Sequence, residues 1–156
     1  RVSKDTGVGL LAYGVLAGGF LGSKYLGQNP PAMDNRSLAK YRMIIEETGG
    51  WQAYQHLLGL LAKIGKRHGV PVELVAARWV LDRPTVSAVI LGIGRRSRAA
   101  ANVRLAELSL DPQDRQRLKE WTEQHPPPGG DMYDLEREEG GPHARLIKTD
   151  LQGVTA

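Results

Sequence analysis

The sequence predicts an α/β fold in which helices connect two short parallel strands, and three observations predict it. Residues 8–12 form an apolar run of strand length, and residues 86–91 form a second run that is largely apolar and β-branched. The segments between the two runs carry apolar residues at spacings of three and four, as amphipathic helices do. A crossover that contains a helix is the usual connection between parallel strands, so we expect the two runs to pair in parallel.

The first strand leads directly into a glycine-rich turn. Residues 8–12 contain no polar side chain, so we expect this strand to be buried on both faces. Gly14 and Gly18 follow it, and glycine lets the backbone turn sharply and come close to a ligand. Tyr13 stands at the carboxyl end of the strand, where parallel α/β folds build their cofactor sites.

The helices are predicted from apolar spacing and from residues that typically begin or end a helix. Gly69 is expected to end one helix, after three cations that complement its dipole. Asp111 is expected to cap another, with Pro112 at its first position. The expected helices cover residues 36–47, 51–68, 72–81, 96–106 and a segment from 112 to beyond 121.

Composition limits the class of protein. The 156 residues, 41% of them apolar, suit one ordinary domain, and no run approaches the roughly 18 to 20 apolar residues that a membrane span needs. The lack of cysteine excludes disulfides and thiolate metal sites and fits a reducing compartment, so the expected location is cytoplasmic. His56 and His68 lack the i, i+4 spacing of a helical metal pair, so no metal site is expected. The first residues carry neither an initiator methionine nor a secretory signal, which indicates a fragment cut upstream.

A net charge of +4 raises the question of nucleic-acid binding. Arg95, Arg96 and Arg98 form the tightest basic cluster, but no aromatic residues interleave it to stack on a single strand. Nucleic acid is therefore not an expected partner. Three cations at the positive end of a helix dipole are unfavourable unless an anion binds there, which favours a phosphate ligand.

Several segments of the chain resemble, in the same order, segments of one enzyme family. Residues 11–21, LAYGVLAGGFL, are similar to its penultimate barrel strand and the turn after it. Residues 61–70, LAKIGKRHGV, together with residues 75–81, resemble its next helix pair. Residues 89–102 resemble the last strand with its cofactor loop, and residues 108–111 resemble the terminal segment. The family is the aldo-keto reductases, (β/α)8 barrels that use NADPH.

This resemblance implies the C-terminal part of a TIM (β/α)8 barrel, about the last two β/α units with a C-terminal helix and tail. Residues 1–124 would form the NADP-binding side of the barrel, and residues 125–156 a loop-rich tail. Members of the family reduce aldehydes and ketones by hydride transfer from NADPH. The implied partners are a small-molecule carbonyl substrate in the complete enzyme and the missing N-terminal barrel segment.

The resemblance also implies roles for individual residues in binding NADP(H). Tyr13 would stack on the nicotinamide, and Asn102 would contact adenine. Arg98 would bind the 2'-phosphate, for which a guanidinium is suited because it grips phosphate oxygens bidentately. The other implied residues line the pyrophosphate (Gly14, Val15, Leu16 and Gly18) or cover the ribose phosphate (Leu91, Gly92, Ile93 and Arg95).

The chain departs from the family pattern in ways that shape the expected function. Gly14 and Val15 replace the usual Ser-Pro, and Ala101 stands where a glutamate commonly helps to hold adenine. The family's Tyr, Asp, Lys and His for proton transfer come from earlier strands, so no catalytic residue is assigned here. Two alternatives stay open: a non-catalytic dinucleotide-sensing subunit, which some potassium-channel β subunits resemble, and a phosphate-binding module.

Overall fold

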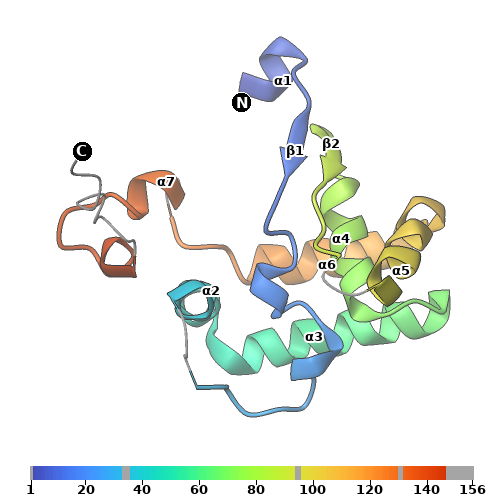
Figure 1. Ribbon diagram of the computed structural model, residues 1–156, viewed down its shortest axis with the longest axis horizontal. Coiled ribbons are helices and arrows are strands. Elements are labelled where there is room, and N and C mark those ends of the chain that lie inside the picture. The colour runs from blue at the N-terminus through green and yellow to red at the C-terminus, as the bar shows by residue number, and fades with distance from the viewer. Residues whose placement is uncertain (1, 33–35, 94–95, 130–131, 147–156) are drawn as a thin grey trace.

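A computed structural model describes residues 2–32, 36–93, 96–129 and 132–146 of the chain, and its two parallel strands lie side by side above the long helices in the view of Figure 1. Strand β1 (Leu10–Ala12) pairs with β2 (Val86–Val89), and Leu10 lies opposite Val86. The register is irregular between Leu10 and Leu11. The predicted parallel α/β arrangement is confirmed, although β2 ends two residues earlier than expected. Ile90 still donates its N–H to the carbonyl of Ala12 at 2.8 Å.

The helices follow the predicted boundaries closely because their caps are as expected. Gly69 adopts a left-handed conformation with φ 63° and donates its N–H to the Gly65 carbonyl. The carboxylate of Asp111 accepts the N–H of Asp114 at 2.8 Å. The longer helices are α2 (Arg36–Glu47), α3 (Gly50–His68), α4 (Val72–Leu81), α5 (Arg96–Glu107) and α6 (Pro112–Gln124).

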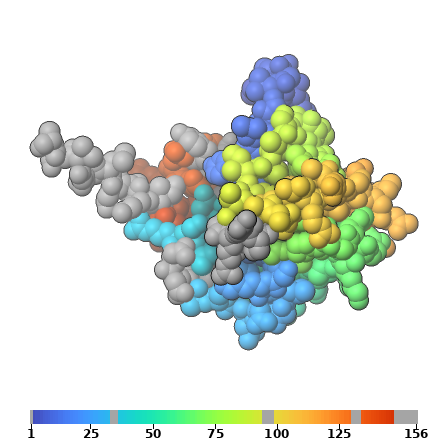
Figure 2. Space-filling view, turned by 45° about the vertical axis from the view of Figure 1, so that its right-hand side comes forward, coloured from blue at the N-terminus to red at the C-terminus, as the bar shows by residue number. Residues whose placement is uncertain are grey.

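The structure also contains short helices and 3₁₀ turns besides the two strands and the longer helices. A five-residue helix, α1 (Val2–Thr6), which the sequence analysis did not predict, projects from the body of the molecule, as Figure 2 shows. Single 3₁₀ turns occur at Ala17–Gly19, Ser23–Tyr25 and Ala144–Leu146, and the tail also contains α7 (Met132–Leu135). None of the helices in the described part of the chain is long and apolar enough to cross a membrane.

The hydrophobic core lies between α3, α4 and the turn after β1. Phe20, Leu58, Ile64 and Val75 are fully buried there. Trp51 and Trp79 pack against this cluster, as expected for core tryptophans. A smaller cluster joins α4 to α5 and consists of Leu74, Ala77, Leu105 and Leu108. These consecutive helices are thereby fixed relative to one another, and the turn after β1 is fixed with them.

The expectation that the first strand is buried on both faces is wrong. Leu10 is 46% exposed and Leu11 66% exposed. A strand of a parallel sheet is buried only where further strands and helices cover it. Within the described ranges β1 pairs with β2 alone, and the helix that contacts this sheet, α4, packs against β2. The apolar side chains of β1 are therefore left in contact with solvent.

The tail folds back onto α2. His143 is buried, and its Nε2 lies 3.0 Å from the carboxylate of Glu47 at the end of that helix. Figure 1 shows the tail lying beside α2, away from the strands. The division of the chain into a barrel part and a tail at residue 124 stays a prediction.

Candidate functional site

A cavity of about 400 Å³ lies where the turn after β1 faces the segment after β2 and the middle of α5. Four of the residues implied by the resemblance line it together: Leu16, Gly18, Gly92 and Asn102. The first two come from the turn and the last two from the second β/α unit. Residues about eighty positions apart in the chain therefore meet around one space of the size that cofactor sites have.

The turn on one side of the cavity is compact and needs its glycines. The Ala17 N–H donates to the Gly14 carbonyl and the Gly19 N–H to the Leu16 carbonyl, both at 2.8 Å. Gly18 has φ 64°, and a Cβ there would come within 2.8 Å of the Tyr41 ring. A side chain at this position would therefore displace either the backbone or α2.

A second wall is the segment that follows the turn, and it brings a lysine to the cavity. The Ser23 N–H and hydroxyl donate to the Glu73 carboxylate at 3.4 and 3.3 Å, which ties this segment to α4. Gln55 accepts the Gly27 N–H at 2.8 Å and donates to the Tyr25 carbonyl at 2.9 Å. Lys24, between these anchors, lines the cavity. Sequence reasoning missed Lys24, and its place in the same glycine-rich segment was the only available signal.

The groups around the cavity suit an anionic ligand that also forms hydrogen bonds. Lys24 supplies a positive charge, and Asn102 supplies an amide that donates and accepts hydrogen bonds. The glycine backbone at Gly19 and Gly92 is open, because a Cβ at either would meet no atom within 4 Å. Glu73 is the one acidic residue among those that line the cavity, and it is engaged with Ser23.

Sequence comparisons relate this chain to known proteins. The model of the aldo/keto reductase family matches residues 1–123 of the chain. The chain belongs to this family. The uncharacterized oxidoreductase YrpG of Bacillus subtilis (strain 168) is 30% identical over 129 residues, which are 83% of this chain and 36% of that protein. Flagellar radial spoke protein 5 of Chlamydomonas reinhardtii is 37% identical over 81 residues, 49% of this chain and 15% of that protein. The chain therefore spans only a minor part of these two relatives.

The aldo/keto reductase chain does not place all of the expected residues around the cavity. Tyr13 is 83% exposed beyond the end of β1. Val15 and Leu91 pack against the cluster that joins α4 to α5. Gly14 lies within the turn, and Ile93 is exposed; neither is among the residues that line the cavity. Arg95 and the side chain of Arg98 lie outside what the structure describes, so their expected roles stay predictions.

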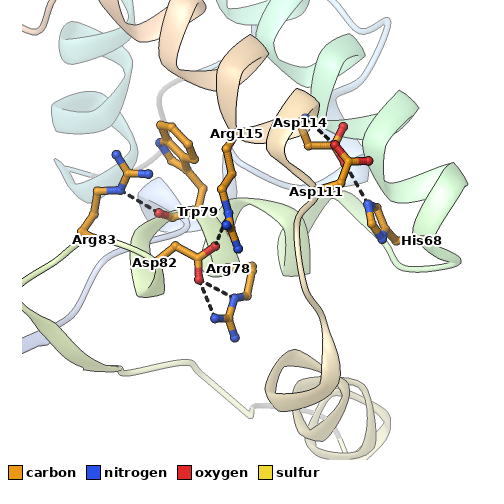
Figure 3. A network of polar contacts seen from close by, with 8 residues as sticks. All are labelled: His68, Arg78, Trp79, Asp82, Arg83, Asp111, Asp114 and Arg115. Carbon is orange, nitrogen blue, oxygen red and sulfur yellow. Dashed lines mark hydrogen bonds and ion pairs between the residues drawn. The ribbon is translucent and has the colours of Figure 1, made fainter.

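A separate polar cluster of this aldo/keto reductase chain joins α3 to α6 (Figure 3). His68 Nε2 lies 2.8 Å from Asp114, which is fully buried, and ligand atoms of His68, Asp111 and Asp114 lie within 4.8 Å of one another. Arg67 ion-pairs with Asp114 and lies 3.9 Å from Asp111. A guanidinium thus already supplies the positive charge that a metal ion would bring, and the cluster acts as an interhelical clamp. The sequence analysis considered His68 only for its spacing from His56 and did not predict this contact with α6.

A similar clamp joins the end of α4 to α6. Asp82 accepts from Nε of Arg78 at 2.7 Å and pairs with Nε of Arg115 at 3.3 Å. Arg83 donates from Nε to the Trp79 carbonyl at 3.1 Å and lies over the Trp79 ring (Figure 3). These contacts fix α4 in position. Glu73, which binds Ser23 beside the cavity, lies on the same helix and is fixed with it.

Proposed function

We propose that this chain forms the cofactor-binding side of an aldo/keto reductase barrel that reduces aldehydes or ketones with NADPH. The observation that carries the proposal is the cavity that joins Leu16 and Gly18 to Gly92 and Asn102 in a member of this family. The dinucleotide, when bound, supplies the hydride. The residues of this chain bind and orient it.

The proposed roles follow from where each residue stands. Lys24 and the open glycine backbone contact the pyrophosphate, and the Asn102 amide bonds to adenine. Tyr13, exposed at the carboxyl end of β1, offers its ring to the nicotinamide. Arg98, in the first turn of α5, pairs with the 2'-phosphate that distinguishes NADPH from NADH.

The remaining barrel strands are the proposed partner of this chain. The exposed apolar side chains of Leu11 and Ile90, on β1 and just after β2, support this, because further strands and helices would bury such surface. The proton that a carbonyl oxygen gains on reduction comes from that other part, since no residue of this chain is assigned to donate it. The carbonyl substrate lies between the two parts.

The cofactor proposal is tested by titrating the chain with NADPH and NADH. Asn102→Ala is expected to weaken NADPH binding about tenfold, the effect of one hydrogen bond worth about 1.4 kcal/mol. Arg98→Ala is expected to lower affinity for NADPH while leaving that for NADH unchanged. His56→Ala, on an exposed face of α3 away from the cavity, is the matched control and retains full affinity. Equal affinities of Asn102→Ala and the wild-type chain would count against the proposed site.

A second candidate is a dinucleotide-binding subunit without turnover, and the similarity to a protein named for the flagellar radial spoke favours it. Both candidates predict that the chain alone binds NADPH without oxidising it. They differ once the complete barrel is present. Oxidation of NADPH by aldehydes, followed at its absorbance, supports the reductase, whereas tight binding with no oxidation supports the sensor.

A further inference from the structure

A second, smaller cavity of about 160 Å³ shares the glycine-rich turn with the first. Ala17, Phe20 and Leu21 of the turn line the smaller cavity, whereas Leu16 and Gly18 line the larger one. Helices α2 and α3 and the α6 residue Trp121 form the rest of its wall. Neither the family resemblance nor the proposed function uses this space.

The wall of this cavity is almost entirely apolar. Ile44 and Ile45 of α2 face Leu57 of α3 across it, and the Trp121 side chain belongs to the same wall. A cavity needs several polar partners to hold an ordered water, whereas an apolar cavity of about 150 Å³ in another protein stays dry and binds benzene. The smaller cavity therefore suits an apolar molecule better than it suits water.

The polar groups of the wall are already used or out of reach. The Thr48 hydroxyl donates to the Ile44 carbonyl at 2.6 Å. The Tyr54 hydroxyl donates to the Phe20 carbonyl at 2.6 Å, and burial raises the pKa of Tyr54, so this donor stays protonated at neutral pH. The Trp121 indole nitrogen has no hydrogen-bond partner, but it is buried and closed off from solvent, so it is out of reach of a molecule in the cavity. Among the residues that line the cavity, these side chains leave no exposed donor for a polar ligand.

The backbone at the cavity is also unusual. Ala17 has φ 49°, a left-handed conformation that costs an alanine energy and that persists only where the surroundings fix it. Such strain is common at ligand sites. Ala17 is one of the residues that line the smaller cavity.

We propose that this cavity is a binding site for a one-ring apolar compound, a small aromatic or alicyclic hydrocarbon without a hydrogen-bonding group. Its volume matches a single ring, its wall is apolar, and its polar groups are either bonded within the protein, as in Thr48 and Tyr54, or closed off from the cavity, as in Trp121. A ligand with a hydroxyl would lose its bond to water and gain none in return. The proposal does not depend on dinucleotide binding.

The test is a titration of the ¹⁵N-labelled chain with toluene and, separately, with phenol, followed through the indole N–H signals. Toluene is expected to shift the Trp121 signal in a saturable way while the signal of Trp79, on α4 outside the cavity, stays in place. Phenol, of similar size, is expected to bind at least tenfold more weakly. Shifts without saturation, or equal affinity for the two compounds, would overturn the proposal.

A pair of variants of α3 locates the ligand. Leu57→Phe adds a ring to the cavity wall and is expected to abolish toluene binding. Leu60→Phe makes the same change at a half-buried leucine of the same helix that does not line the cavity, and it is expected to leave toluene binding unchanged. If both variants bind toluene as the wild-type chain does, the ligand lies elsewhere and the proposal fails. If Leu57→Phe does not fold, the titration of the wild-type chain with toluene and phenol tests the proposal by itself.

Discussion

The α3–α4 layer and the β1–β2 pair are both rich in apolar side chains, yet they differ sharply in burial. Leu58 of α3 is fully buried, whereas Leu11 of β1 is 66% exposed. The helical layer closes on itself, because α3, α4 and the turn after β1 bury one another. The strands depend on neighbours that the described residues do not supply. Apolar side chains therefore stabilise the helical region by being buried, whereas those of the strand pair remain exposed to solvent.

The largest expected loss of stability comes from truncating a buried side chain of the helical layer. Leu58→Ala is expected to lower the free energy of unfolding by about 2–5 kcal/mol, because it removes buried methyl groups and leaves a cavity. Leu11→Ala is expected to lower it by less than about 1 kcal/mol, since that side chain is largely in water already. Urea unfolding followed by circular dichroism measures both. Similar decreases in the free energy of unfolding for the two variants would contradict the proposed difference between the regions.

An intermediate effect is expected at the polar clamp between α3 and α6. Asp114→Ala removes a fully buried carboxylate from Arg67 and His68, and the expected loss is about 2 kcal/mol of unfolding free energy. Glu123→Ala, which breaks the exposed pair with Lys119 on the same helix, is expected to cost less than about 0.5 kcal/mol. Thermal and urea unfolding of both variants provide the measurement. An Asp114→Ala chain as stable as the wild type would mean that apolar packing alone holds the layer.

The smallest effect depends on pH and concerns Tyr54, in the same layer. Burial raises the pKa of Tyr54 in the folded chain, whereas an unfolded tyrosine titrates near about 10. The stabilisation that the Tyr54 hydroxyl contributes to the folded chain is therefore fully present below about pH 10. It is lost as pH rises further, because the unfolded state then releases a proton that the folded state keeps. Tyr54→Phe is expected to be about 1 kcal/mol less stable at pH 7, through loss of the bond to Phe20. That difference should shrink between pH 10 and 11 in urea unfolding; a constant difference would contradict the assignment.

The parts of this fold that could be predicted from sequence are those fixed by neighbours in the chain. Gly69 and Asp111 mark helix ends through backbone conformation and a local hydrogen bond, so the boundaries of α3 and α6 could be read directly. The parallel pairing also followed, because a helical crossover permits little else. Exposure of β1 could not be predicted, since burial depends on what covers a strand and not on the strand itself.

The candidate site likewise has features that the sequence predicts and features that depend on contacts between distant residues. Leu16, Gly18, Gly92 and Asn102 were expected at one site through the family resemblance, and the cavity that joins them agrees with it. Lys24 was missed because its position depends on a bond between Ser23 and Glu73, fifty positions apart. The bond between His68 and Asp114 spans forty-six positions and was missed for the same reason. Spacing along a sequence is informative within a helix or strand and uninformative across such distances.

The one-sided pairing of β1 and β2 also bears on the order of assembly. In the part of the chain that the structure describes, each strand pairs with the other along one edge and leaves its second edge open. An open edge accepts an extended segment from any source, another copy of the chain included. In the proposed barrel, the remaining strands must therefore dock before two copies of the chain meet edge to edge, and a low protein concentration favours the barrel.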